Sequence, residues 1–112
     1  MQDGRSVQER RQYPRINLHT ELWLGEGGVF TRTMARLTDV SLRGARIVSN
    51  DAYQVGSILS VRFRIRTGFI TATASVRNVH SGGIGIEFLD LSPEHKDRLE
   101  AFILSGEFEL RV

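Results

Sequence analysis

Hydrophobic and polar residues alternate over several short stretches of this chain, which is the pattern of strands that bury one face. The clearest stretch is residues 58–66, where arginines alternate with apolar side chains. Its apolar positions are Leu59, Val61, Phe63 and Ile65. Residues 70–76 continue the alternation, so the two stretches are predicted to form a hairpin that turns at Thr67 and Gly68.

Four more stretches complete a set of six predicted strands. They are residues 16–24, 30–38, 45–49 and 84–88. Segments rich in turn-forming residues separate them, among them GEGG and SGG. Six short strands with regularly spaced turns are typical of an antiparallel barrel or sandwich, so the fold is predicted to be dominated by β structure.

The period changes near the end of the chain, where a helix is predicted. Ser92 can cap this helix and Pro93 can occupy its first position. Gly106 is a typical helix end, which leaves residues 106–112 as a C-terminal tail. One apolar stripe is predicted to pack on the sheet, and it consists of Leu99, Phe102 and Ile103.

Composition indicates one globular domain. The chain has 112 residues, of which 40% are hydrophobic and 25% charged, which suffices for one modest core. It has no cysteine, and its three histidines fall on separate predicted elements, so we expect neither a metal site nor an enzyme. No apolar run approaches the roughly 20 residues of a membrane-spanning helix, and the start lacks a secretion signal. We therefore expect a cytoplasmic protein that does not insert into membranes.

Positive charge is concentrated near the start, although the net charge is only +2. Fourteen of the fifteen basic residues are arginine, whose planar guanidinium group suits bidentate phosphate contacts and stacking. Three of these arginines lie in the segment RRQYPR, at residues 10–15. Residues 1–9 show no periodicity and are predicted to form a flexible arm.

Arg11 and Arg15 are four residues apart in this segment. Because Pro14 disfavours helical backbone at Tyr13, the two arginines are predicted to share one face of an extended segment, about 13 Å apart. Each guanidinium group could hold a phosphate, grip the edge of a guanine or stack on a purine. The alternative is a solvated basic arm without a ligand.

The segment DVSLRG, at residues 39–44, is the second candidate site. Asp39 and Ser41 are predicted to project to the same face, where a carboxylate and a hydroxyl can bond the edge of a guanine. Gly44 suits a backbone with positive φ or a ligand that comes close to the chain. The alternative is an Asx-turn that joins two strands.

Together the two segments resemble the PilZ domain family, whose pattern is R-x-x-x-R followed by [D/N]-x-S-x-x-G. The pattern is met without substitution by Arg11, Arg15, Asp39, Ser41 and Gly44. The segment GGIGIEF is also similar to the last barrel strand of that family. The resemblance covers about residues 9 to 105 and places a PilZ domain at residues 10–105. It implies a six-stranded antiparallel β-barrel with a C-terminal α-helix.

The resemblance also implies a ligand, the bacterial second messenger cyclic di-GMP, and no other cofactor. In this hypothesis Arg11 and Arg15 hold guanine and phosphate. The other guanine is bound by Asp39 and Ser41, beside Gly44.

Two further arginines are candidates for contacts with the ligand. In similar proteins an arginine directly before the arginine pair accompanies a stacked pair of ligand molecules, and Arg10 occupies that position. Arg77, predicted to face outward on the fifth strand, is an additional candidate for stacking, with an ordinary exposed arginine as the alternative.

The predicted function is that of a single-domain receptor and adaptor. Ligand phosphates would neutralise the repulsion between the arginines and fold the arm over the barrel, which changes a surface read by a protein partner. One alternative is a PilZ-like module that binds proteins without nucleotide. Another is a small barrel that binds nucleic acid, which we disfavour because the aromatic residues are scattered along the sequence. They include Tyr13, Trp23, Tyr53 and Phe69.

Overall fold

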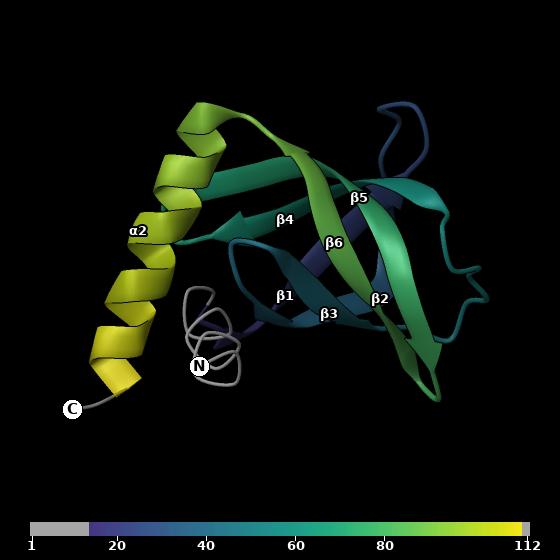
Figure 1. The fold of residues 1–112 in the computed structure, drawn as a ribbon, viewed down its shortest axis with the longest axis horizontal. Coiled ribbons are helices and arrows are strands. Elements are labelled where there is room, and N and C mark those ends of the chain that lie inside the picture. Colours follow the sequence, from purple (N-terminus) through teal and green to yellow (C-terminus); the bar gives the residue numbers. More distant parts are fainter. Residues whose placement is uncertain (1–13, 111–112) are drawn as a thin grey trace, which may run out of the picture.

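The computed structural model describes residues 14–110, with backbone only for 31–33 and 106–110. Six strands precede one helix (Figure 1). The strands are β1 (Ile16–Gly25), β2 (Thr31–Val40), β3 (Gly44–Val48), β4 (Ile58–Ile65), β5 (Gly68–His80) and β6 (Gly83–Leu91). The helix is α2 (Pro93–Leu110). The predicted arm, together with Arg10 and Arg11, lies outside the described residues.

The strands close into a barrel in the order β1-β2-β3-β6-β5-β4, and every neighbouring pair is antiparallel. The ring closes where the last part of β1, from Leu22 to Gly25, pairs with β4. The predicted six-stranded antiparallel barrel with a C-terminal helix is thereby confirmed, and the closed strand order distinguishes it from a sandwich.

Alternating side chains fill the barrel, as the sequence pattern predicts. The apolar parity of β4 points inward, and its members Leu59, Val61, Phe63 and Ile65 are all buried. Phe63 is fully enclosed and stacks on Phe88 of β6, with ring centroids 6.2 Å apart. Burial of each such large side chain contributes about 1.5–3 kcal/mol to folding, so this interior is the main source of stability.

Helix α2 lies across one end of the barrel (Figure 1) and buries Leu99 and Ile103 in the same core. Its start agrees with the prediction, because the His95 amide donates to Ser92 Oγ at 3.2 Å. The prediction that Gly106 ends it is wrong, since the helix continues to Leu110. A glycine inside a helix costs only about 1 kcal/mol relative to alanine, which the flanking helical turns can offset. No helix among the described residues is long and apolar enough to cross a membrane.

The connection between β4 and β5 differs by one residue from the predicted hairpin. Ile65 pairs with Gly68, so the turn consists of Arg66 and Thr67 rather than of Thr67 and Gly68. Gly68 is instead the first residue of β5 and has a φ of 135°, a backbone conformation that residues with a Cβ rarely adopt. The glycine is therefore needed beside the turn and not within it.

Two aromatic residues that are distant in sequence meet on the outer surface. Trp23 of β1 and Phe69 of β5 have ring centroids 5.5 Å apart in an edge-to-face arrangement. Strand β4 lies between their strands, with Arg62 opposite Trp23 and Arg64 opposite Phe69. The aromatic residues are scattered along the sequence, yet the pairing of β1 and β5 with β4 brings these two rings together.

Candidate ligand-binding site

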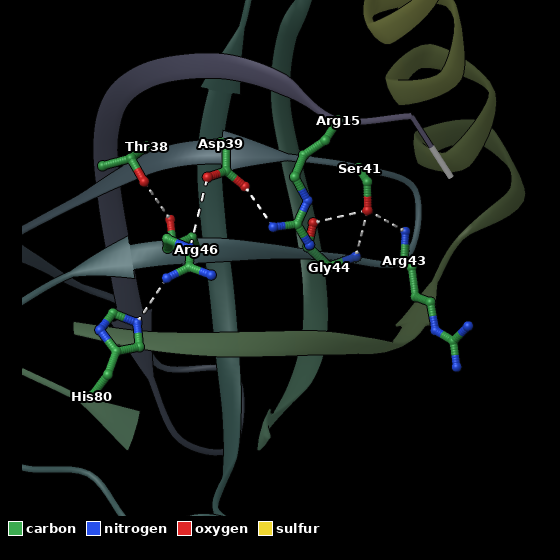
Figure 2. Close-up of polar contacts among 8 residues, drawn as sticks. All are labelled: Arg15, Thr38, Asp39, Ser41, Arg43, Gly44, Arg46 and His80. Atoms are coloured by element: carbon green, nitrogen blue, oxygen red, sulfur yellow. Dashed lines mark hydrogen bonds and ion pairs between the residues drawn. The ribbon is translucent and has the colours of Figure 1, made fainter. Parts of the chain in front are cut away.

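The two sequence motifs meet through Arg15 and Asp39. Arg15 Nη1 lies 3.2 Å from Asp39 Oδ1 (Figure 2). The contact follows from the pairing of β1 with β2, in which Ile16 stands opposite Val40 and Asn17 opposite Asp39. The barrel thus brings the last arginine of the first motif onto the carboxylate of the second.

Asp39 has a second arginine on its other side. Arg46 stands opposite it on β3, with Nε 3.9 Å from Asp39 Oδ2. The same guanidinium group reaches His80, because Arg46 Nη1 lies 3.2 Å from His80 Nε2 (Figure 2). One carboxylate between two guanidinium groups leaves a net positive charge at this point of the surface, which favours an anionic ligand.

The carboxylate also retains a vacant acceptor. Asp39 Oδ1 is enclosed and has no hydrogen-bond partner among the described residues. Its contact with Arg15 meets the distance of an ion pair but not the geometry of a hydrogen bond, so we treat it as an electrostatic contact only. This oxygen can therefore accept a hydrogen bond if Arg15 moves aside.

Ser41 holds the turn between β2 and β3. Its hydroxyl oxygen accepts from the amides of Arg43 and Gly44 at 3.1 and 3.2 Å, and the Ser41 amide donates to the Gly44 carbonyl at 2.8 Å. Only 2% of the residue is exposed. The turn alternative for this motif is thus supported, but the side chain that makes the turn is Ser41 and not Asp39. The contact of Ser41 with a ligand stays a prediction.

Gly44 is required by the neighbouring strand. Its φ is not in the positive region, so that part of the prediction is wrong. A Cβ at this position would overlap the carbonyl oxygen of Ile86 and approach the Glu87 Cα to 3.2 Å. The motif glycine therefore allows β3 and β6 to pair closely.

A second charged cluster lies next to this turn, and the sequence motifs gave no indication of it. Arg43 Nε is 3.5 Å from one carboxylate oxygen of Glu87, and Arg77 Nε is 3.3 Å from the other. Arg77 is exposed, as predicted, yet it is held by this ion pair. The alternation in GGIGIEF places Glu87 outward, but its partners follow only from the pairing of β6 with β3 and β5.

A row of outward residues crosses five strands and includes Asp39 and Arg46. In register order it runs through Asn17, Asp39, Arg46, Gly85 and Asn78. The row has a glycine near its centre, and the Asn78 side chain lies over that glycine. The Asn78 amide fills the space above this glycine, so the row is polar along its length.

The structure brings together four of the predicted site residues: Arg15, Asp39, Ser41 and Gly44. Arg77 is connected to these residues by Glu87, which also pairs with Arg43 in the β2–β3 turn. Among the side chains that the structure describes, no three histidines, aspartates or glutamates gather as a metal site would require.

Comparison with known proteins agrees with this arrangement. The sequence matches the PilZ domain over residues 9–105, and the chain belongs to the PilZ domain family. No curated protein matches it.

Two solved structures illustrate the shared fold. The Bacillus subtilis inhibitor of motility (MotI/DgrA) superposes with a TM-score of 0.79 at 19% identity, over 92% of this chain and 54% of that one. This chain thus spans about half the length of the Bacillus protein. The PilZ domain of Escherichia coli YcgR, solved with c-di-GMP, superposes with a TM-score of 0.69 at 21% identity, over 91% of this chain and 95% of that domain.

Proposed function

We propose that this domain is a cytoplasmic receptor for cyclic di-GMP, with neither an enzymatic reaction nor a metal. The observation that carries the proposal is the contact between Arg15 and Asp39, which unites the two motifs in one surface. The ligand has two phosphates and two guanines, and the surface offers guanidinium groups and a carboxylate that complement both. The family and the ligand of the Escherichia coli domain support this assignment.

Binding would proceed by exchange of partners at Asp39. A guanine presents two N–H donors, which the Asp39 carboxylate can accept once Arg15 turns away. Arg15 is then available for a phosphate or for the O6 and N7 edge of a guanine. Because the Arg15 end of this ion pair is solvent-exposed, the loss of the pair would cost less than the new charge-assisted contacts would contribute.

The remaining contacts would come from the other arginines. In the proposal Arg11 holds guanine and phosphate together with Arg15, and Arg10 favours a stacked pair of ligand molecules. Arg77 could leave Glu87 to stack on a base at the edge of the site. Ser41 and Gly44 contribute through the shape of the turn and a close approach of the ligand to the backbone.

The output would be a change of surface that a protein partner reads. Ordering the arm over the barrel costs conformational entropy, which the new contacts have to exceed. The domain would therefore act as an adaptor whose arm is ordered only in the liganded state.

Isothermal titration with cyclic di-GMP tests the proposal and gives the number of ligands per domain. Arg15→Ala should weaken binding at least about tenfold, the usual cost of losing a charge-assisted contact. Arg36→Ala is the matched control, because Arg36 is also exposed on β2 but stands opposite Glu21 and Val48 rather than the residues that pair with Asp39. A folded wild-type domain that takes up no cyclic di-GMP would contradict the proposal and favour a nucleotide-independent protein-binding module.

A further inference from the structure

Arginines and aromatic rings form a second distinctive surface on the outer face of β1, β4 and β5. We call Trp23, Arg62, Arg64 and Phe69 the arginine–aromatic patch. The Arg62 guanidinium carbon lies 4.2 Å from the centroid of the Phe69 ring, and that of Arg64 lies 5.8 Å from it. Trp23 meets the same ring edge-to-face at 5.5 Å.

The two arginines of the patch lie on the wall opposite Arg46 of the candidate ligand site. In the closed order β1-β2-β3-β6-β5-β4, strand β4 is three places from β3 in either direction. Arg62 and Arg64 on β4 therefore face away from Asp39 and Arg46, with the barrel core between them. A molecule on the patch would leave the ligand site accessible.

The arginines of the two surfaces differ in whether a carboxylate pairs with them. On the ligand side, Arg15 and Arg46 pair with Asp39, and two further arginines pair with Glu87. No ion pair within the described residues involves Arg62 or Arg64. Arg62 Nε is even enclosed without a hydrogen-bond partner there. Among the side chains that the structure describes, the two guanidinium groups of the patch thus have no carboxylate partner.

The aromatic rings keep these charges in place. A guanidinium group stacked on a ring loses fewer rotamers on binding than a free one, so it can contribute more affinity. Helix α2 also contacts the backbone of Phe69, because Arg98 Nη2 donates to the Phe69 carbonyl oxygen at 2.7 Å. Tryptophan and arginine are also the residues most enriched among those that dominate protein interfaces.

We propose that the arginine–aromatic patch is a docking surface for an acidic helix of a protein partner, which extends the adaptor part of the proposed function. Outward residues two apart on a strand, such as Arg62 and Arg64, are about 7 Å apart. Carboxylates four residues apart on a helix are separated by about 6 Å along its axis, which is close to the spacing of the two arginines. Single-stranded nucleic acid fits less well, because it needs rings for its bases and here the rings contact each other and the arginines.

A pocket beside the patch can take an apolar side chain of the same partner. It has a volume of about 260 Å³ and lies between the β4–β5 turn and α2, where Thr67, Arg98 and Phe102 line it. Arg98 connects the pocket to the patch through its bond to Phe69. An acidic helix with one large apolar residue would engage both features.

Trp23 makes the proposal directly measurable, because it is the single tryptophan of the chain. The probe is a synthetic amphipathic helical peptide with glutamates four residues apart and leucines between them, titrated into the full chain. We expect a saturable change in Trp23 fluorescence. The double variant Arg62→Gln, Arg64→Gln should weaken binding by about tenfold or more, whereas Arg36→Gln should bind as the wild type does.

Three results would overturn the docking proposal. They are a flat titration with the wild type, equal binding of a peptide with lysines in place of the glutamates, and tighter binding of an oligothymidylate than of the acidic peptide. Titration of the same variants with cyclic di-GMP separates the two proposals. Arg62→Gln, Arg64→Gln should keep nucleotide binding, while failure of the wild type to bind cyclic di-GMP would contradict the receptor proposal and leave the peptide result standing.

Discussion

Arg15 and Asp39 form an ion pair whose two members differ sharply in exposure. The arginine side chain is 53% exposed and the aspartate side chain only 18%. An approaching ligand therefore meets the guanidinium group first and reaches the carboxylate only after Arg15 has moved. The more exposed group therefore lies on the outside of the candidate site.

Replacing Asp39 should separate the acceptor role from the charge. Asp39→Ala removes the acceptor for guanine, and we expect cyclic di-GMP affinity to fall at least about tenfold. Asp39→Asn keeps one carbonyl oxygen and also agrees with the family pattern, so it should retain measurable binding. Isothermal titration of both variants checks this, and equal loss in the two would show that the charge matters more than the acceptor.

Ser41→Ala should weaken the fold as well as any ligand contact. The change leaves the amides of Arg43 and Gly44 without their acceptor in an enclosed turn. We expect a loss of about 1–3 kcal/mol in the free energy of unfolding, measured by urea denaturation. Unchanged stability together with lost binding would instead assign the hydroxyl to the ligand alone.

Gly44→Ala should loosen the pairing of β3 with β6. The added Cβ would overlap the Ile86 carbonyl, and relief of such overpacking typically costs about 1–3 kcal/mol. Amide hydrogen exchange should show faster exchange in β3 and β6, with smaller effects in β4. Protection equal to that of the wild type in all strands would contradict this account of the glycine.

Removing the Glu87 carboxylate should strengthen nucleotide binding. Glu87→Gln releases Arg43 and Arg77 from their ion pairs, so more positive charge is available to the phosphates. We expect affinity to rise several-fold and to fall more steeply with salt, because screening acts on exposed charges. Titrations at low and high salt measure both effects, with Glu94→Gln on α2 as a control that removes the same charge elsewhere. Weaker binding by Glu87→Gln would indicate that the carboxylate itself contacts the ligand.

The contribution of helix α2 to stability can be measured with two leucines. Leu99 is fully buried against the barrel, whereas Leu104 is 54% exposed on the same helix. Leu99→Ala should cost about 2–5 kcal/mol, and Leu104→Ala less than about 0.5 kcal/mol. Thermal and urea unfolding check the difference, and similar values for the two would mean that the helix is not part of the core.

The six strands could be predicted from the sequence, because local alternation sets each inward position, as in β4. Prediction from the sequence failed where long-range contacts decide the outcome. Glycine is required at position 44 because of a carbonyl group of β6, which lies far away in the sequence. The glycine at position 106 does not by itself end α2. At the site, Asp39 stood in a recognisable motif, but Arg46 and Glu87 gain their roles only through strand order. The contact of Trp23 with Phe69 likewise required the closure of β1 onto β4.

Ser41 and Gly44 have a consequence for how related sequences are sorted. In this chain both residues serve the architecture of the β2–β3 turn and its junction with β6. A PilZ domain that does not bind the nucleotide could therefore still carry S-x-x-G. Under the proposed function, the positions that distinguish nucleotide-binding sequences are the carboxylate at 39 and its cationic neighbours.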